Sequence, residues 1–346
     1  MLNSKSKVMI VIFSCLLLML TGCIKELPQP ENSSPELHND TFSNKLSTES
    51  VEINPVAFSH HEQEFEIIPF YKEILEYVEQ ARKDRAENME LLYFDYVLEP
   101  FRRSAWGDTS SLTVNYYQVT STKMLDKLEE YTYLLLKDQE NINDSIKEAL
   151  IKSADVLPAK EKKKIYLFPF HPDYDYVSEL MKGIEGYAYD EEVIILSIDP
   201  YHYTNNVLRG FVASNYYNAV YSELTYRKSP TLLDSVVMSG KSHAFATIIF
   251  PDINIPLVEP LSKNEETLVW STMADLLSRQ KSTADLYFNF ANGDQSVGIP
   301  YWSNHRIGYQ IMQDFLKYNP DVPVEEWITM DSSDILEKSR FNERFE

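Results

Sequence analysis

Apolar side chains in the first half of the folded region recur at helical spacing. Over residues 67–103 the pattern predicts two helices, with a break at Pro100. Over residues 122–156 it predicts a long helical stretch with a break near residues 141–143. No arrangement typical of catalysis occurs in this half. We therefore interpret residues 63–157 as an N-terminal helical region that serves as a scaffold or as the wall of a cleft.

The pattern changes at Pro158. The apolar runs 164–170 and 192–198 predict buried strands, and the glycine-containing segment 183–189 between them is expected to be extended. Helical spacing then returns in the segments 204–226, 230–249, 263–280, 284–291, 301–318 and a short C-terminal pair. A small sheet followed by a helix-rich C-terminal half, with a helical part before it, predicts an α+β fold.

Small polar residues interrupt the apolar stripes of two successive predicted helices. One stripe of the helix over 204–226 consists of Val207, Phe211, Ser214, Asn218 and Tyr221. The corresponding stripe of the next helix consists of Leu232, Val236, Ser239 and His243. Buried polar groups need hydrogen-bond partners, so the polar residues on these stripes are candidate site residues.

The N-terminus has the pattern of a bacterial lipoprotein signal. Lys5 and Lys7 precede an apolar run over residues 8–20, and the segment 20–23 (Leu-Thr-Gly-Cys) resembles the box in which a cysteine is lipidated. We expect cleavage after residue 22, acyl chains such as palmitate on Cys23, and a position on the bacterial cell membrane outside the cytoplasm. A plain secretory signal or an uncleaved membrane anchor is the alternative.

Residues 23–62 are expected to form the lipidated N-terminus and a disordered tether. The segment is rich in Pro, Asn, Ser and Glu, and it lacks an apolar period. A flexible chain of this length reaches roughly 35 Å, enough to lift a domain above lipid headgroups. A structured N-terminal arm is the alternative. The remaining cysteine, Cys15, would leave with the signal, so no disulfide is expected.

The net charge excludes one class of partner. The chain carries a formal charge of −21, and loss of Lys5 and Lys7 with the signal makes the mature form more acidic by two charges. Such a chain is not expected to bind nucleic acid, nor to hold anionic lipid by electrostatic attraction. At 44% hydrophobic and 13% aromatic residues, the chain is expected to be globular.

The second half of the chain resembles a bacterial family of predicted zinc-dependent proteases. Members share a helix with A-H-E-x-x-H and a following helix with L-L-D-x-x-x-x-E-G. The matching features are Ala213, the run 232–234 (Leu-Leu-Asp), Gly240 and the segment 307–309 (Ile-Gly-Tyr). The resemblance implies a zincin-like fold and a metallopeptidase-like domain over residues 158–346.

The residues that would hold and use zinc in this family are replaced here. The two histidine positions correspond to Ser214 and Asn218, the general-base glutamate to Asn215, and the third ligand to Ser239. Zinc in such sites needs imidazole and carboxylate donors, which serine and asparagine do not supply. An amide also lacks the basicity to activate water. We therefore expect no catalytic residues, no bound metal and no other cofactor, although active relatives would use zinc.

Two further sets of residues are candidates for a site. His202, His243 and His305 offer a relocated metal site, with ordinary surface or hydrogen-bonded histidines as the alternative. The aromatic and polar segment 298–309 could line a residual cleft. In an active relative, groups corresponding to Tyr301, His305 and Tyr309 could stabilise an oxyanion, and ordinary packing is the alternative.

Three functions remain open from the sequence. The preferred hypothesis is a lipid-anchored pseudoprotease whose cleft binds a peptide or a protein without cleaving it. A structural or accessory surface lipoprotein with a filled cleft is the second, and an active zinc peptidase with displaced ligands is the third. An enclosed cleft, with Ser214, Asn215 and Ser239 bonded to one another, would argue against binding at that point.

Overall fold

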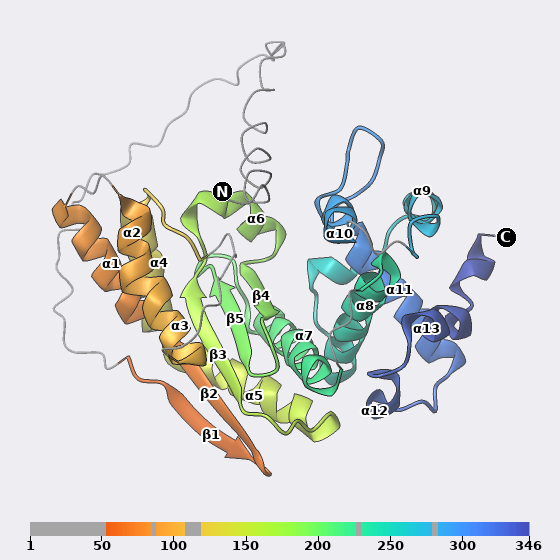
Figure 1. Ribbon diagram of the computed structural model, residues 1–346, viewed down its shortest axis with the longest axis horizontal. Coiled ribbons are helices and arrows are strands. Elements are labelled where there is room, and N and C mark those ends of the chain that lie inside the picture. The colour runs from red at the N-terminus through yellow and green to blue at the C-terminus, as the bar shows by residue number, and fades with distance from the viewer. Residues whose placement is uncertain (1–52, 85–87, 108–118, 226–229, 279–282, 346) are drawn as a thin grey trace, which may run out of the picture. The chain divides into compact units, whose positions relative to one another are not determined.

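Five strands form a mixed sheet in the order β1-β2-β3-β5-β4 (Figure 1). The strands are β1 (Val56–His60), β2 (Gln63–Pro69), β3 (Lys163–Pro169), β4 (Ile184–Ala188) and β5 (Val193–Ile198). The central pairs β2–β3 and β3–β5 are parallel, whereas β1–β2 and β4–β5 are antiparallel. This computed structural model describes residues 53–84, 88–107, 119–225, 230–278 and 283–345, which belong to one compact unit.

Alternate side chains of the central strands pack into two separate cores. On β3, Ile165 and Leu167 join one core, and Tyr166 and Phe168 join the other. Strand side chains point to opposite faces in turn, so each core marks one covered face of the sheet. Because both faces are buried, the central strands appear in the sequence as continuous apolar runs.

Helices cover both faces (Figure 1). The first face carries α1 (Tyr71–Asp84), α2 (Met89–Tyr93), the π-helical segment η1 (Phe94–Leu98) and α3 (Glu99–Trp106). The second carries α5 (Gln139–Val156) and α7 (Asn205–Leu224), and α4 (Leu125–Lys137) contributes to both cores. The remaining helical elements are η2 (Pro172–Tyr174), α6 (Asp175–Leu180), α8 (Leu232–Ile249), η3 (Pro256–Val258), α9 (Lys263–Ala274), α10 (Thr283–Asn292), α11 (Ser303–Tyr318), α12 (Val324–Trp327), α13 (Ser332–Ser339) and η4 (Phe341–Arg344).

The predicted α+β class is confirmed, as are the two strands and the helix-rich C-terminal half. Three details were wrong. The break expected at Pro100 does not occur, because Pro100 lies in the first turn of α3, which continues directly from η1. The segment expected to begin as a helix at residue 67 is the end of β2, because a short run buried on both faces cannot be told from a helix by periodicity alone. The break expected near residues 141–143 falls at Asp138 instead. Asn141 and Asn143 are accommodated inside α5 through side-chain bonds to Asp138 and Gln139.

The sheet extends into regions that were expected to be separate from it. Val56–His60, at the end of the predicted tether, forms β1, and Phe58 stacks on Phe65 with ring centroids 5.0 Å apart. The expected boundary between residues 157 and 158 separates β2 from β3, which are neighbours in the sheet. The predicted signal, Cys23 and the tether up to residue 52 lie outside the described residues.

Two glycines set the distance between α8 and α11. A Cβ added at Gly240 would overlap the backbone carbonyl group of Gly308, and one added at Gly308 would overlap the carbonyl oxygen of Val236. The two backbones can therefore approach this closely only without side chains at these positions. This contact places the first turns of α11 beside the middle of α8.

Within the described part of the chain, no helix combines the length and the hydropathy that a bilayer crossing requires.

Candidate functional site

The residues at the zinc-ligand positions lie on two helices that are almost entirely enclosed. Thr204 caps the start of α7 by accepting a hydrogen bond from the backbone of Val207. Thr231 and Asp234 form a reciprocal capping box at the start of α8. These caps fix where each helix begins, and hence which side chains of α7 and α8 face each other. Ser214 and Ser239 are both buried, at 4% and 6% exposure.

Five polar side chains form one continuous hydrogen-bonded chain at this interface. The Oγ of Ser214 lies 3.4 Å from Nδ1 of His243, and Nε2 of His243 lies 3.0 Å from Nδ1 of His305. The Nε2 of His305 is 3.0 Å from the hydroxyl of Tyr287, which is 2.6 Å from Oγ of Ser239. We call this set the five-residue network. It joins α7, α8, α10 and α11.

The direction of every hydrogen bond in the network follows from Ser239, whose donor role is fixed. Ser239 donates its hydroxyl proton to the carbonyl oxygen of Ser235, so its Oγ accepts from Tyr287. Tyr287 must then accept from Nε2–H of His305, whose Nδ1 accepts from Nε2–H of His243. The Nδ1 of His243 is left to accept from Ser214. Both imidazoles are therefore neutral with the proton on Nε2, and all four ring nitrogens are used.

Burial keeps the network uncharged at neutral pH. Desolvation lowers the pKa of His243 well below its usual value, and the neighbouring His305 lowers it further. Burial lowers the pKa of His305 to about 4 and raises the pKa of Tyr287 to about 12. The network thus holds neutral groups in mutually satisfied pairs, which is the arrangement expected of a structural polar core.

The other two replaced positions do not join the network. The side-chain amide of Asn215 donates to the carbonyl oxygen of Phe211 in the preceding turn, at 2.9 Å. The Oδ1 of Asn218 is buried without a hydrogen-bond partner among the described residues. Ser214 and Ser239 are therefore connected through the histidines, whereas Asn215 and Asn218 are not.

The donors at this interface do not fit zinc. Ser214, Asn218 and Ser239 present neutral oxygens, and the network contains no carboxylate or thiolate. Its two imidazoles direct a ring nitrogen at each other rather than at a common point between them. Zinc sites in proteins use three or four strong nitrogen, sulfur or carboxylate donors around one position. Binding here would require this set of hydrogen bonds to be broken without a replacement for the missing anionic ligand.

The remaining predicted site residues lie in three different surroundings. His202 bonds through Nδ1 to the buried carboxylate of Asp199 at 2.8 Å, so it is not part of the network with His243 and His305. The hydroxyl of Tyr309 bonds to Thr247 at 3.4 Å. Of the expected cleft residues, Tyr301 lines a surface cavity. The lipidation site, Cys23, lies outside the described residues.

The cavity that includes Tyr301 has a volume of about 450 Å³ and is open to solvent. Trp302 and Arg306 contribute to its wall from the start of α11, and Glu259 and Glu265 contribute acidic groups. The guanidinium group of Arg306 lies 3.8 Å from the Glu259 carboxylate. The cavity thus combines aromatic rings with both signs of charge, next to the turn that carries His305.

Sequence reasoning did not single out Tyr287, although it links Ser239 to His305. It is one of 23 tyrosines, and no motif marks it. Its partner Ser239 lies 48 positions earlier in the chain, so only the packing of α10 against α8 and α11 brings the hydroxyl groups together. The helix containing Tyr287 was predicted, but its role was not.

Comparison with known proteins identifies a family. A family model described as Predicted Zn-dependent protease (DUF2268) matches residues 142–337, which include α7, α8, α10, α11 and the whole five-residue network. No curated protein matches the chain. No solved structure matches it either.

Proposed function

This chain belongs to the family of predicted Zn-dependent proteases, and we propose that it is a member that binds peptides without cleaving them. The observation that carries the proposal is the five-residue network. Two positions at which the family motif has zinc ligands are occupied here by Ser214 and Ser239. A chain of hydrogen bonds through two neutral histidines and Tyr287 links these serines. Peptide hydrolysis at neutral pH by this family's chemistry needs a metal-activated water and a general base, and these side chains supply neither.

The peptide would bind in the Tyr301 cavity rather than at the network. Cavities of a few hundred Å³ with aromatic walls and a few charged groups are typical of ligand sites. Here Trp302 and Tyr301 offer apolar surface, and Arg306 and Glu259 offer charges for the peptide backbone or side chains. The side chains of the network are hydrogen-bonded to one another, and three of the five are buried, so the cleft residue that favours binding is Tyr301 rather than His305 or Tyr309.

The N-terminal sequence supports a position of the protein at the membrane. The basic residues, the apolar run and the box that ends at Cys23 favour a mature protein held by lipid on the outer side of the bacterial cell membrane. The acidic chain would then present its cavity on a tether of roughly 30 residues, clear of the anionic headgroups.

The loss of zinc binding can be tested by restoring the motif. We would compare zinc per chain, by mass spectrometry, in the parent and in a variant with Ser214→His, Asn215→Glu, Asn218→His and Ser239→Glu. The variant is expected to hold one zinc more than the parent, because the two helices supply the required spacing. A folded variant with no additional zinc would show that α7 and α8 are not arranged as in zinc-binding relatives.

Peptide binding needs a separate test. A random-sequence peptide array would be probed with the parent, with Trp302→Ala and with Phe288→Ala. Phe288 is 59% exposed and lies outside the cavity, so it is a matched aromatic control. We expect Trp302→Ala to lose the signal and Phe288→Ala to keep it. Equal signals from both variants would contradict binding in this cavity.

An active zinc peptidase is the second candidate, because two imidazoles, those of His243 and His305, lie together in the matched region; the bond between them would have to be replaced by bonds to the metal. It requires the parent to cleave peptides in a way that a chelator abolishes and that His243→Ala removes. That result would overturn the proposal of a non-cleaving member. The filled-cleft alternative, a structural lipoprotein, is favoured if the array gives no signal with the parent.

A further inference from the structure

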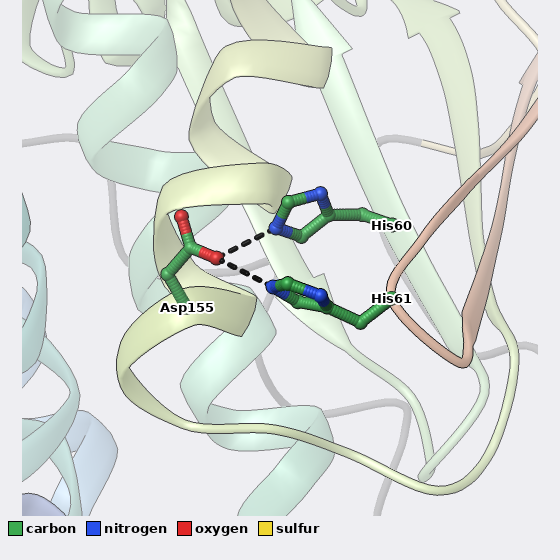
Figure 2. A group of neighbouring side chains, drawn as sticks. All are labelled: His60, His61 and Asp155. Atoms are coloured by element: carbon green, nitrogen blue, oxygen red, sulfur yellow. Dashed lines mark hydrogen bonds and ion pairs between the residues drawn. The ribbon is translucent and has the colours of Figure 1, made fainter.

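A second group of histidines lies at the turn between the edge strand β1 and β2, outside the five-residue network (Figures 1 and 2). His60 ends β1, His61 begins the tight turn to β2, and Asp155 lies in the last turn of α5. The Nε2 atoms of His60 and His61 are 2.6 Å and 3.2 Å from the same carboxylate oxygen of Asp155. Figure 2 shows both rings directed at this carboxylate from the turn. We call these three residues the hairpin cluster.

The separations of the three potential donor atoms suit one metal ion. All three lie within 4.8 Å of one another. In a tetrahedral zinc site with bonds of about 2.0–2.1 Å, neighbouring ligand atoms are about 3.3 Å apart. The two oxygen-to-nitrogen separations of the cluster are within about 1 Å of that value. A metal could therefore replace the two hydrogen bonds with small side-chain adjustments and no backbone rearrangement.

Solvent has more access to the cluster than to His243, Ser214 and Ser239 of the five-residue network, which are buried. The side chains of His61 and Asp155 are 74% and 49% exposed, and that of His60 is 23% exposed. An arriving ion can keep its waters in the coordination positions that the protein does not fill. His60 and Asp155 are tied to regular elements, β1 and α5, so two of the three donors are held in place by the fold.

The backbone at the turn holds His61 in a left-handed conformation. His60 pairs with Gln63, so His61 and Glu62 form a two-residue hairpin loop. His61 has φ of 52°, a conformation that favours glycine in such turns. Histidine is one of the residues that tolerates it, and here the conformation turns the ring toward Asp155.

We propose that His60, His61 and Asp155 form a binding site for a divalent transition-metal ion, with Zn²⁺ as the ion to test. Two imidazoles and one carboxylate favour zinc, nickel or copper over magnesium or calcium, which prefer all-oxygen sites. The bound ion would fasten the β1–β2 turn to the end of α5. In the sequence, β1 follows the segment that begins at Cys23. Metal binding would therefore stabilise the first strand after the predicted tether.

The site is independent of the proposed function. His60 and His61 precede the part of the chain that the family model matches, and no residue of the cluster belongs to the network or to the Tyr301 cavity. The hairpin cluster can therefore bind metal whether or not the chain cleaves or binds peptides.

The test is calorimetric titration of the detergent-solubilised full-length protein with Zn²⁺, after chelator treatment and its removal. We expect one additional equivalent in the parent relative to the triple variant His60→Gln, His61→Asn and Asp155→Asn. Each single substitution should weaken that binding at least about tenfold, since even indirect partners of a metal site are worth 10–100-fold. His61→Asn retains a residue that tolerates the turn, so its effect reports on the imidazole.

Two controls make the result specific. His202→Gln removes a partly exposed histidine that is bonded to an aspartate elsewhere, and it should leave Zn²⁺ binding unchanged. Excess Mg²⁺ should not compete. Amide hydrogen exchange in β1 and β2 should slow when Zn²⁺ is added to the parent but not to the triple variant. Equal Zn²⁺ binding by the parent and the triple variant would overturn the proposal.

Failure of this proposal and failure of the proposed function give different results. The motif-restored variant described above would also be made in the background of the triple variant. Zinc gained there belongs to α7 and α8, whereas zinc lost between the parent and the triple variant belongs to the hairpin cluster.

Discussion

The molecule contains two pairs of neighbouring histidines in opposite surroundings. His243 and His305 meet between α8 and α11, bonded to each other and to hydroxyl groups. His60 and His61 meet at an exposed turn and share a carboxylate. The first pair lies within the region matched by the family of predicted zinc proteases, yet the second has the better set of metal donors.

The difference shows that partners and solvent access, more than the presence of histidine, decide what such a pair can do. Enclosed imidazoles that satisfy one another act as neutral parts of a core, because charging either one carries a desolvation cost. Imidazoles beside a carboxylate and open to water retain an anionic partner and an entry path for an ion. Four predictions test this contrast, beginning with the largest expected effect.

The close contact of α8 with α11 is required to bring His243 to His305. We expect Gly240→Ala to reduce the free energy of unfolding by about 3 kcal/mol, because the added Cβ overlaps backbone atoms of Gly308 that cannot move as a flexible side chain would. Chemical denaturation measures the change. Gly210→Ala in α7 is the control, since its Cβ would meet only side-chain methyl groups of Ile253 and Ile255, which can shift, and we expect it to cost no more than about 1 kcal/mol. An equal loss in both variants would contradict the close approach.

His243→Ala should destabilise the fold by about 2–3 kcal/mol, because it leaves buried partners unsatisfied and opens a cavity. The unsatisfied groups are the hydroxyl of Ser214 and Nδ1 of His305. Ser214→Ala, at one end of the network, should cost about 1 kcal/mol, as expected for a single hydrogen bond. Denaturant unfolding of both variants provides the comparison. If His243→Ala lowered the free energy of unfolding no more than Ser214→Ala does, the network would not act as a connected unit.

Acidification should weaken the fold through the enclosed pair. The pKa of His305 is about 4 when folded and about 6.5 when unfolded. Between these values the unfolded chain binds a proton that the folded chain does not, so stability falls as pH falls. The slope attributable to one such histidine is up to about 1.4 kcal/mol per pH unit.

The measurement compares the free energy of unfolding of the parent and of His305→Gln between pH 7 and pH 4. Carboxylates contribute to both proteins alike, so the difference in slope isolates the histidine. We expect the parent to lose stability more steeply. If the free energy of unfolding changed with pH equally in both proteins, the pKa of His305 would be the same in the folded and unfolded chain.

Periodicity was sufficient to predict the fold class, the strands β3 and β5, and the helices that carry the network. Long apolar stripes on α7 and α8 fix which face is buried, and that placed Ser214 and Ser239 inside. Periodicity could not predict β1, because its five residues are mostly exposed and the strand is held by pairing with β2. Likewise, β2 is too short for its apolar run to be distinguished from the start of a helix.

Long-range contacts limited what could be predicted of either histidine pair. His243 and His305 were named as candidates, but their direct bond spans 62 positions and depends on two glycines that let α8 and α11 touch. His60 and His61 are adjacent in sequence, yet their aspartate lies 95 and 94 positions later. In both places the sequence supplies the residue types, and only the sheet and helix packing supplies the partner.

The smallest effect is expected at the exposed pair. Without metal, His61→Asn should change the free energy of unfolding by no more than about 0.5 kcal/mol. At an exposed site, water forms hydrogen bonds with both side chains that are about as favourable as the bond between them. Asparagine also tolerates the positive φ of the turn, so no backbone strain is added. With saturating Zn²⁺ the parent should become more stable than this variant, since an ion that binds only the folded state stabilises it by mass action. Thermal unfolding of both proteins, with chelator and with Zn²⁺, separates the two contributions. A large loss with chelator present would mean that the hairpin pair, like the enclosed pair, is part of the structural core.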